Sequence, residues 1–359
     1  MIRKKIVTDI DACGRLWNSL IPVHNLSDLW EIRLCFHQHY RHRLHFLVFE
    51  DRNEIVGMIP LVYLTERDKY VFFPGEIWNG KTWLERTSVF CRRPEDLGYL
   101  LSECPDRTYL RYIDSDHASS LAELDVDETA YLLYPPEFNF DLDLYYQRFV
   151  WKKLKAIKKE IASFLGPESS WHLNRLPDYD LLVEMNLKRF GETSYFYDSR
   201  FAESFRDVMR LLDRKGWLRM VSLQIGAETA AIDLSALFNG SYVVMLGGTH
   251  LQFPGIAKAM NMQHIEFACQ NQVSKVDFLC GDFCWKKLWH LDPEPLYKYV
   301  SPELKREQER VSDALEKQLD VTDPVKEIGV LGLSGRDVDR GLRVYPEPWQ
   351  LSEPRPIIY

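Results

Sequence analysis

The segment VDFLCGDFCWKKLWH, residues 276–290, begins as a buried strand and ends in a dense group of charged and aromatic residues. Gly281 and Asp282 follow the strand, and Trp285 and Lys286 come about one helical turn later. Groups at the carboxyl ends of parallel strands are well placed for catalysis, so this acid and this amine are candidates for proton transfer. Asp282 can equally cap the next helix, or pair with Lys286 four residues later.

A short glycine loop, QFPGIA at residues 252–257, joins a predicted strand to a predicted helix. The free N–H groups and positive dipole of a helix N-terminus bind anions, and glycine lets a phosphate approach the backbone closely. Pro254 has no N–H, so the cradle would be built from residue 255 onward. Glycine in this place can also supply an ordinary turn. The residues expected to hold an anion are Gln252, Gly255, Ile256, Ala257 and Lys258.

Three further residues are candidates for proton transfer or substrate binding. Asp233 lies in the apolar run AAIDLSAL, where it would be a base if it faces a cleft and inert if it faces solvent. His250 is a candidate base because a neutral imidazole accepts protons near pH 7. Arg189 can bind a carboxylate or phosphate of an acceptor, and an internal ion pair is an equal alternative.

The elements that would position these residues repeat along the chain. Two helices followed by three strands joined by hairpins are predicted twice, about 170 residues apart, which is typical of a duplicated unit. An Asn-Gly pair at 239–240, between two apolar runs, predicts a tight hairpin in the second half. The predicted ranges are helices 10–20 and 26–40 with strands within 45–75, then helices 179–190 and 200–215 with strands within 217–250.

A crossover unit is predicted after the last of these strands. The chain passes through the glycine loop into a helix at 256–271 and a strand at 275–280, an arrangement that makes the two strands parallel. A further helix is predicted at 143–164, between two prolines and the Gly-Pro pair at 166–167. Its stretch WKKLKAIKK would form a solvated face by default, although its lysines can also meet a phosphate or an RNA.

The motif Q-x-x-G-x-A at 252–257 resembles the pyrophosphate-binding motif of the GNAT acyltransferases, and the order hairpin, hairpin, glycine loop, helix, strand is the order of that fold. Residues from about 140 to 290 look more closely like the GNAT-type domain named after the cellulose-biosynthesis protein CelD, which is related to the FemAB aminoacyl transferases. The matching residues are Asn186, Arg189 and Phe190, then Gly216, Trp217 and Leu218, Ala230 and Ala231, Pro254 and Gly255, and finally Asp277, Phe278, Leu279, Gly281, Asp282, Trp285 and Lys286.

This resemblance implies an α/β (α+β) fold with two GNAT-like mixed-sheet domains in tandem. We expect a degenerate domain at 1–134, the acyltransferase domain at 135–300, and a helix with a Pro-rich tail at 301–359. The implied reaction moves an acyl group from an acyl coenzyme A, such as acetyl-CoA, to an amine or hydroxyl of a sugar or peptide-like acceptor, in cell-envelope or exopolysaccharide synthesis. Arg189 and Trp285 would bind the acceptor.

Two alternatives to this reaction stay open: an aminoacyl-tRNA donor, as in the FemAB relatives, and a binding protein of the same fold without catalysis. The pattern also departs from the family at one point. Many GNAT enzymes carry a glutamate on the fourth strand, but VVMLGGT contains none, so the general base is not assigned by the resemblance.

Composition narrows the class of protein. With 46% hydrophobic and 13% aromatic residues the chain of 359 residues is expected to be globular, and its net charge of −8 disfavours a general nucleic-acid binder. Seven scattered cysteines indicate reduced thiols in a cytoplasm, and the spacing of Cys280 and Cys284 does not suit zinc. No apolar run reaches the roughly 20 residues of a membrane span. We therefore expect neither a metal nor a span, and the oligomeric state stays open.

Overall fold

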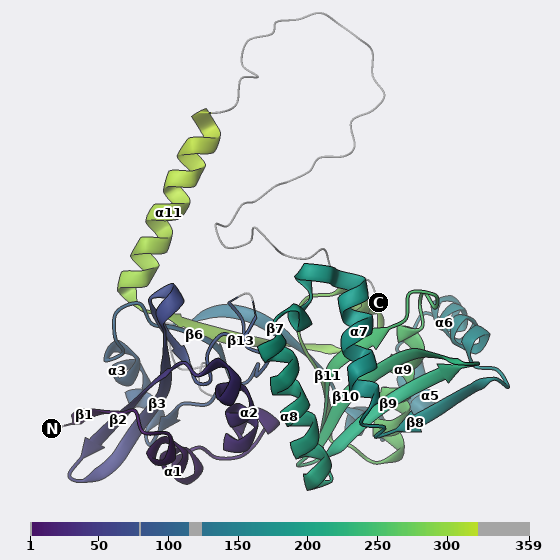
Figure 1. Ribbon diagram of the computed structural model, residues 1–359, viewed down its shortest axis with the longest axis horizontal. Coiled ribbons are helices and arrows are strands. Elements are labelled where there is room, and N and C mark those ends of the chain that lie inside the picture. Colours follow the sequence, from purple (N-terminus) through teal and green to yellow (C-terminus); the bar gives the residue numbers. More distant parts are fainter. Residues whose placement is uncertain (1, 79, 115–123, 322–359) are drawn as a thin grey trace, which may run out of the picture.

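The computed structural model describes residues 2–78, 80–114 and 124–321 and arranges them as two sheets with helices packed on them (Figure 1). The first half contains β1 (Arg3–Val7), α1 (Ile10–Leu20), α2 (Trp30–Tyr40), β2 (Arg43–Asp51), β3 (Glu54–Leu64), β4 (Lys69–Phe72), β5 (Phe90–Cys91), α3 (Leu97–Ser102), β6 (Tyr109–Ile113) and β7 (Asp125–Leu133). The second half contains α5 (Leu142–Tyr146), α6 (Trp151–Phe164), β8 (Ser169–Leu173), α7 (Asp178–Phe190), α8 (Ser199–Lys215), β9 (Leu218–Ile225), β10 (Glu228–Phe238), β11 (Ser241–Thr249), α9 (Ala257–Gln270), β12 (Lys275–Cys280), α10 (Cys284–Leu288), β13 (Asp292–Val300) and α11 (Pro302–Val321). The predicted Pro-rich tail lies outside the described residues.

The same order of elements occurs in both halves, which confirms the tandem GNAT-like fold expected from the sequence. A strand, two helices and three antiparallel strands run from β1 to β4 and again from β8 to β11. Asn239 and Gly240 both have positive φ, 48° and 71°, as a tight primed hairpin turn requires. The leading strand of each unit, β1 and β8, was not predicted, because most of its residues are exposed and show no alternation.

Two helices, α5 and α6, replace the single helix predicted at 143–164. The chain between them places Phe149 against Trp289, with ring centroids 6.1 Å apart and an interplanar angle of 75°. One turn earlier, the hydroxyl of Tyr145 donates to the backbone carbonyl of Trp289 at 2.6 Å. Contacts more than 100 residues away in sequence therefore interrupt this helix, and no local signal marks the break.

The larger sheet exchanges strands between the two halves. Its order is β6-β13-β7-β12-β11-β10-β9-β8, so β13 lies between two strands of the first half and β7 lies between two strands of the second. The division predicted at residue 134 therefore does not separate the two sheets. The halves also meet where α2 packs on α8, with the Phe36 and Phe205 rings edge to face at 5.3 Å.

The strands β11 and β12 pair only at their starts, where residues 241–243 run parallel to residues 275–277. Beyond that point they separate, and α9 begins at the end of the loop that follows β11. One face of this sheet is covered by α7 and α8, and the other by α6 and α9, whose buried residues form two separate apolar clusters. The separation of β11 from β12 leaves space within the sheet, between the two helix layers that cover its faces. Side chains of both halves of the chain meet in this space.

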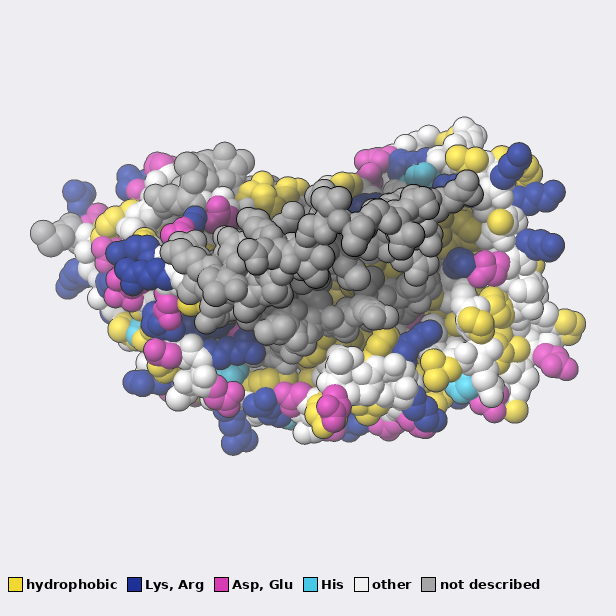
Figure 2. Space-filling view, turned by 90° about the horizontal axis from the view of Figure 1, so that it is seen from above, with side chains coloured by type: hydrophobic (Ala, Val, Ile, Leu, Met, Phe, Trp, Pro, Cys, Tyr) yellow, Lys and Arg dark blue, Asp and Glu magenta, His cyan; other side chains and the backbone are white. Residues whose placement is uncertain are grey.

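On the face seen in Figure 2, basic and acidic side chains are interspersed among apolar ones. This mixture fits a net charge of only −8 and differs from the single-sign surface of a general nucleic-acid binder. Among the helices that the structure describes, none is both long and apolar enough to cross a bilayer.

Candidate functional site

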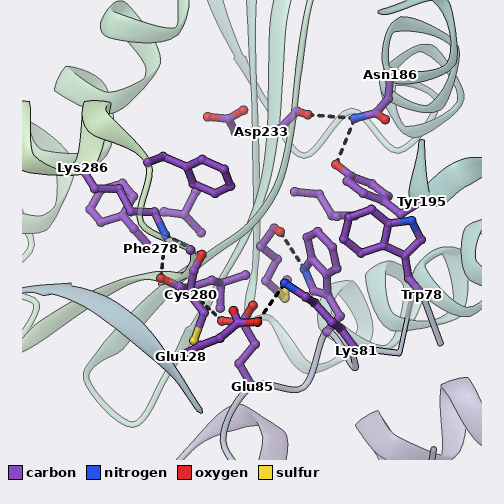
Figure 3. Close-up of a pocket in the computed structure, with 18 of the residues that line it drawn as sticks. Trp78, Lys81, Glu85, Glu128, Asn186, Tyr195, Asp233, Phe278, Cys280 and Lys286 are labelled. Carbon is purple, nitrogen blue, oxygen red and sulfur yellow. Dashed lines mark hydrogen bonds and ion pairs between the residues drawn. The ribbon is translucent and has the colours of Figure 1, made fainter. Parts of the chain in front are cut away.

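The separated ends of β11 and β12 border a cavity of about 210 Å³ that both halves of the chain line (Figure 3). Its walls come from β10, β11, β12, α7 and the start of α9 in the second half, and from Trp78, residues 81–85, β6 and β7 in the first. This volume is large enough to hold several water molecules. The cavity therefore admits the reacting part of a small acceptor.

Glu85 and Glu128 place two carboxylates at one end of this cavity. Lys81 Nζ and Arg111 Nη2 each lie 2.8 Å from Glu128 Oε1, whereas Glu85 accepts the backbone N–H of Cys280. Burial and the nearby charge of Glu128 raise the pKa of Glu85 to about 7. Burial acts on Glu128 too, but Lys81 and Arg111 outweigh it and hold its pKa below the usual value. Near neutral pH, Glu85 thus exchanges a proton readily, as a general base must.

Lys286 supports the irregular end of β12 beside Glu85. The residue is 1% exposed, and its Nζ donates to the carbonyl oxygens of Leu279 and Cys280, each at 2.7 Å. Leu279 has a φ of +61°, which is uncommon for a leucine, and its N–H donates to Asp277 at 2.8 Å. Burial lowers the pKa of Lys286, and the charge of Glu85 opposes this shift. Two of the three N–H groups of the ammonium donate to backbone carbonyl oxygens, so the main role of Lys286 is to position the end of the strand.

Asp277 both holds a backbone N–H group and pairs with an arginine. Its Oδ1 accepts the N–H of Leu279, and its Oδ2 lies 3.4 Å from Arg86 Nε. Arg86 comes from the first half and also reaches Glu294 at 2.7 Å and Asp114 at 3.1 Å. This ion-pair network ties the end of β12 to the first half and thereby fixes the wall of the cavity.

Asp233 lies at the other end of the cavity and starts a buried polar chain. Its Oδ2 is 2.8 Å from Nε2 of His264, and Nδ1 of His264 is 2.7 Å from the hydroxyl of Tyr242. His264 belongs to α9, the helix that follows the glycine loop, and both His264 and Tyr242 are fully buried. Asp233 thus faces the cleft rather than solvent, which decides between the two alternatives left by the sequence.

Asn186, part of the predicted motif on α7, anchors the aromatic wall beside Asp233. Its amide donates to the hydroxyl of Tyr195 at 3.0 Å, and its Oδ1 accepts from Ser194 at 2.6 Å. The rings of Trp78 and Trp83 lie 5.9 Å and 4.6 Å from the ring of Tyr195, and all three line the cavity. The two halves therefore build this wall together.

The glycine loop lies beside the cavity, with a carboxylate already at its glycine. Gly255 has a φ of +88°, and a side chain there would collide with the carboxylate of Glu160 from α6. Glu160 also pairs with Lys258 at 2.5 Å. An incoming diphosphate would have to displace this carboxylate, which sequence reasoning did not foresee. Of the other predicted loop residues, Gln252 is exposed, Ile256 is buried in the core, and Ala257 lines the cavity.

Asp282 and Lys286 do not form the pair that their spacing allows. The carboxylate of Asp282 is 61% exposed, accepts from the hydroxyl of Tyr131 at 2.6 Å and lies 2.9 Å from Lys287 Nζ. Lys286 instead points inward, on the buried side of the five-residue helix α10. Of these residues, only Lys286 lines the cavity.

The remaining candidates divide between the cavity and its surroundings. Trp285 lines the cavity. Arg189 donates to the hydroxyl of Thr249 at the end of β11, and Nδ1 of His250 accepts the N–H of Gln252 at 3.3 Å. Neither Arg189 nor His250 is among the lining residues.

Sequence reasoning missed the contribution of the first half, above all Lys81, Glu85 and Glu128. The segment KTWLER, residues 81–86, has neither helical nor strand periodicity. The useful signal was indirect: without a glutamate on the fourth strand, another element had to supply the carboxylate. Among the described residues, no group of three or more His, Cys, Asp or Glu is placed to hold a metal ion.

Comparison with known proteins supports the fold. Residues 155–287 match the GNAT acetyltransferase domain family. The crystal structure of FemX is similar with a TM-score of 0.52 and 9% identity, covering 88% of this chain and 100% of that one. The C-terminal domain of a putative lysylphosphatidylglycerol synthetase from Agrobacterium fabrum is similar with a TM-score of 0.51 and 10% identity, and the match covers 88% of this chain and 97% of that one. L-PGS from Bacillus licheniformis is similar with a TM-score of 0.50 and 11% identity, and the match covers 87% of this chain and 97% of that one.

A comparison with curated proteins found no match. At identities near 10%, the solved structures show a common fold and nothing further about the reaction. The family match lies within the stretch that resembles GNAT and CelD-type sequences, and the tandem order of elements agrees with it. Residues 155–287 therefore match the GNAT acetyltransferase domain family, within a fold that is similar to that of FemX.

Proposed function

We propose that this protein transfers an acyl group from an acyl coenzyme A to an amine or hydroxyl of a sugar or peptide-like acceptor, with Glu85 as the general base. The observation that carries the proposal is Glu85 itself, a carboxylate with a pKa of about 7 that lines a cavity between the two diverging GNAT strands. Of the bases suggested by the sequence, Asp282 and His250 lie outside this cavity, and Asp233 lines it with one carboxylate oxygen engaged by His264. We place the reaction in the cytoplasm, where the seven free thiols would stay reduced.

The proposed chemistry is direct transfer within a ternary complex. The acceptor gives a proton to Glu85 while its nitrogen or oxygen attacks the thioester carbonyl, and the carbon–sulfur bond then breaks. The proton held by Glu85 is returned to the departing thiolate, so atoms and charge balance. A covalent route through Cys280 is disfavoured, because burial and the neighbouring Glu85 raise the pKa of its thiol well above the usual value.

Glu85→Gln tests the proposal because glutamine keeps the shape of the side chain and cannot accept the proton. We expect purified wild-type protein to release free thiol from acyl coenzyme A in the presence of amine acceptors, and the variant to lose about 10²-fold or more of this rate. Glu228→Gln, at an exposed hairpin position, serves as the matched control. Transfer by the variant at the wild-type rate would refute the role of Glu85.

An aminoacyl-tRNA donor is a second candidate, and two observations favour it. Glu160 already stands at the glycine loop that a coenzyme A diphosphate would use. The same helix, α6, exposes a run of lysines suited to a nucleic-acid backbone: Lys152, Lys153, Lys155, Lys158 and Lys159. Changing these lysines to glutamate would abolish tRNA retention in a gel-shift assay if this donor is correct. Absence of tRNA binding by the wild-type chain would exclude it.

A further inference from the structure

The cavity contains an acidic group at each of two separated places. Glu85 and Glu128 lie at one end with Lys81, whereas Asp233 lies at the other end beside Asn186 (Figure 3). Glu128 is neutralised by Lys81, which leaves Glu85 as the proton acceptor at its end. Asp233 is not needed for that proton transfer, so its presence in the opposite wall calls for another role.

Asp233 lines the cavity, and its surroundings hold one of its two carboxylate oxygens. Oδ2 is engaged by His264 at 2.8 Å, and the hydroxyl of Tyr242 holds His264 from behind. These two partners are fully buried, so the carboxylate has a fixed orientation. A carboxylate held in this way is built to accept hydrogen bonds from a charged donor rather than to rotate in solvent.

The wall between the two acidic places suits an alkyl chain with a positive end. Trp78, Trp83 and Tyr195 line it with their rings in mutual contact, and aromatic faces attract ammonium groups. The amines that line the cavity are already engaged, since Lys81 pairs with Glu128 and Lys286 holds two carbonyl oxygens. Among the described lining residues, an acceptor carboxylate would therefore meet engaged cations and three acidic side chains, Glu85, Glu128 and Asp233.

We infer that Asp233 forms a binding subsite for a second ammonium group, so that the acceptor is a diamine or a molecule with the same two charges. This inference rests on the proposed acyl transfer and adds the acceptor class to it. One amine is acylated beside Glu85, and the other lies against Asp233 and the aromatic wall. The negative charge of Asp233 would favour this acceptor over one that carries a carboxylate or phosphate at the same place.

Calorimetry with three five-carbon probes tests this subsite without any donor: 1,5-diaminopentane, pentylamine and 5-aminopentanoate. We expect the diamine to bind about tenfold or more tightly than the monoamine, and the aminocarboxylate to bind more weakly than both. Asp233→Asn should reduce diamine affinity to the level of the monoamine and leave the monoamine unchanged. Asp125→Asn, an exposed acid on β7, is the matched control.

The outcomes separate the inference from the proposed function. Equal binding of diamine and monoamine, no binding of any probe, or no effect of Asp233→Asn would overturn the subsite. Diamine binding that depends on Asp233, with no transfer from any acyl thioester, would support the subsite and overturn the proposed reaction. Transfer to pentylamine without preference for the diamine would support the proposed reaction and overturn the subsite. If Asp233→Asn fails to fold by circular dichroism, the three probes on the wild-type chain decide the question alone.

Discussion

Glu85→Gln should make the protein more stable at neutral pH while removing its activity. A rise of the Glu85 pKa from 4.5 to about 7 corresponds to about 3 kcal/mol of destabilisation once the group must ionise in the folded state. Below pH 4.5 both folded and unfolded chains hold the proton, so there is no penalty. Between pH 4.5 and 7 the unfolded chain loses the proton first and the penalty grows, and above pH 7 it is complete. Glutamine avoids this cost and still accepts the N–H of Cys280, and Lys286 keeps its two hydrogen bonds to backbone carbonyl oxygens.

Urea unfolding of both proteins between pH 5 and pH 8.5 measures this effect. We expect the variant to exceed wild type by about 1 kcal/mol at pH 5 and by about 3 kcal/mol at pH 8.5. Glu228→Gln should change stability by less than about 0.5 kcal/mol at every pH. A difference that does not vary with pH, or a variant less stable than wild type at neutral pH, would contradict the assignment of a buried, raised-pKa carboxyl to Glu85.

Two further changes test the surroundings of the site. Lys286→Met should lower the free energy of unfolding by about 3–5 kcal/mol, because it removes the two charge-assisted hydrogen bonds to the carbonyl oxygens of Leu279 and Cys280 at the end of β12; an unchanged urea midpoint would contradict this role. Glu160→Gln should tighten acyl coenzyme A binding roughly fivefold, equivalent to about 1 kcal/mol, because it removes a carboxylate from the glycine loop. Calorimetry checks the second change, and an unchanged or weaker affinity would count against this loop as the diphosphate site.

Local signals in the sequence were sufficient for much of the fold. The turn at Asn239 and Gly240, the glycine loop and the helix after it depend on the conformational preferences of a few neighbouring residues. The repeated order of helices and hairpins follows from periodic burial, which the chain shows in both halves. The exposed strands β1 and β8 lack this periodicity and were missed for that reason.

The candidate site was only partly predictable. Asp233, Trp285, Lys286 and Ala257 were named from the sequence and line the cavity, while Asp282 lies outside it. Lys286 is buried and Lys287 is exposed because of the orientation of the five-residue helix α10, which depends on packing against the rest of the fold. No pattern within residues 282–287 states which lysine turns inward.

The sequence by itself determined the local elements and the residue types near the end of β12, because helix, strand and turn preferences act between residues close in the chain. Only the tertiary structure decided that β7 and β13 exchange places in the large sheet, and that Glu85 meets Cys280 across 195 positions. The folded environment also sets the pKa of Glu85, because burial and nearby charge raise it. Neither property can be inferred from the residues next to Glu85 in the sequence.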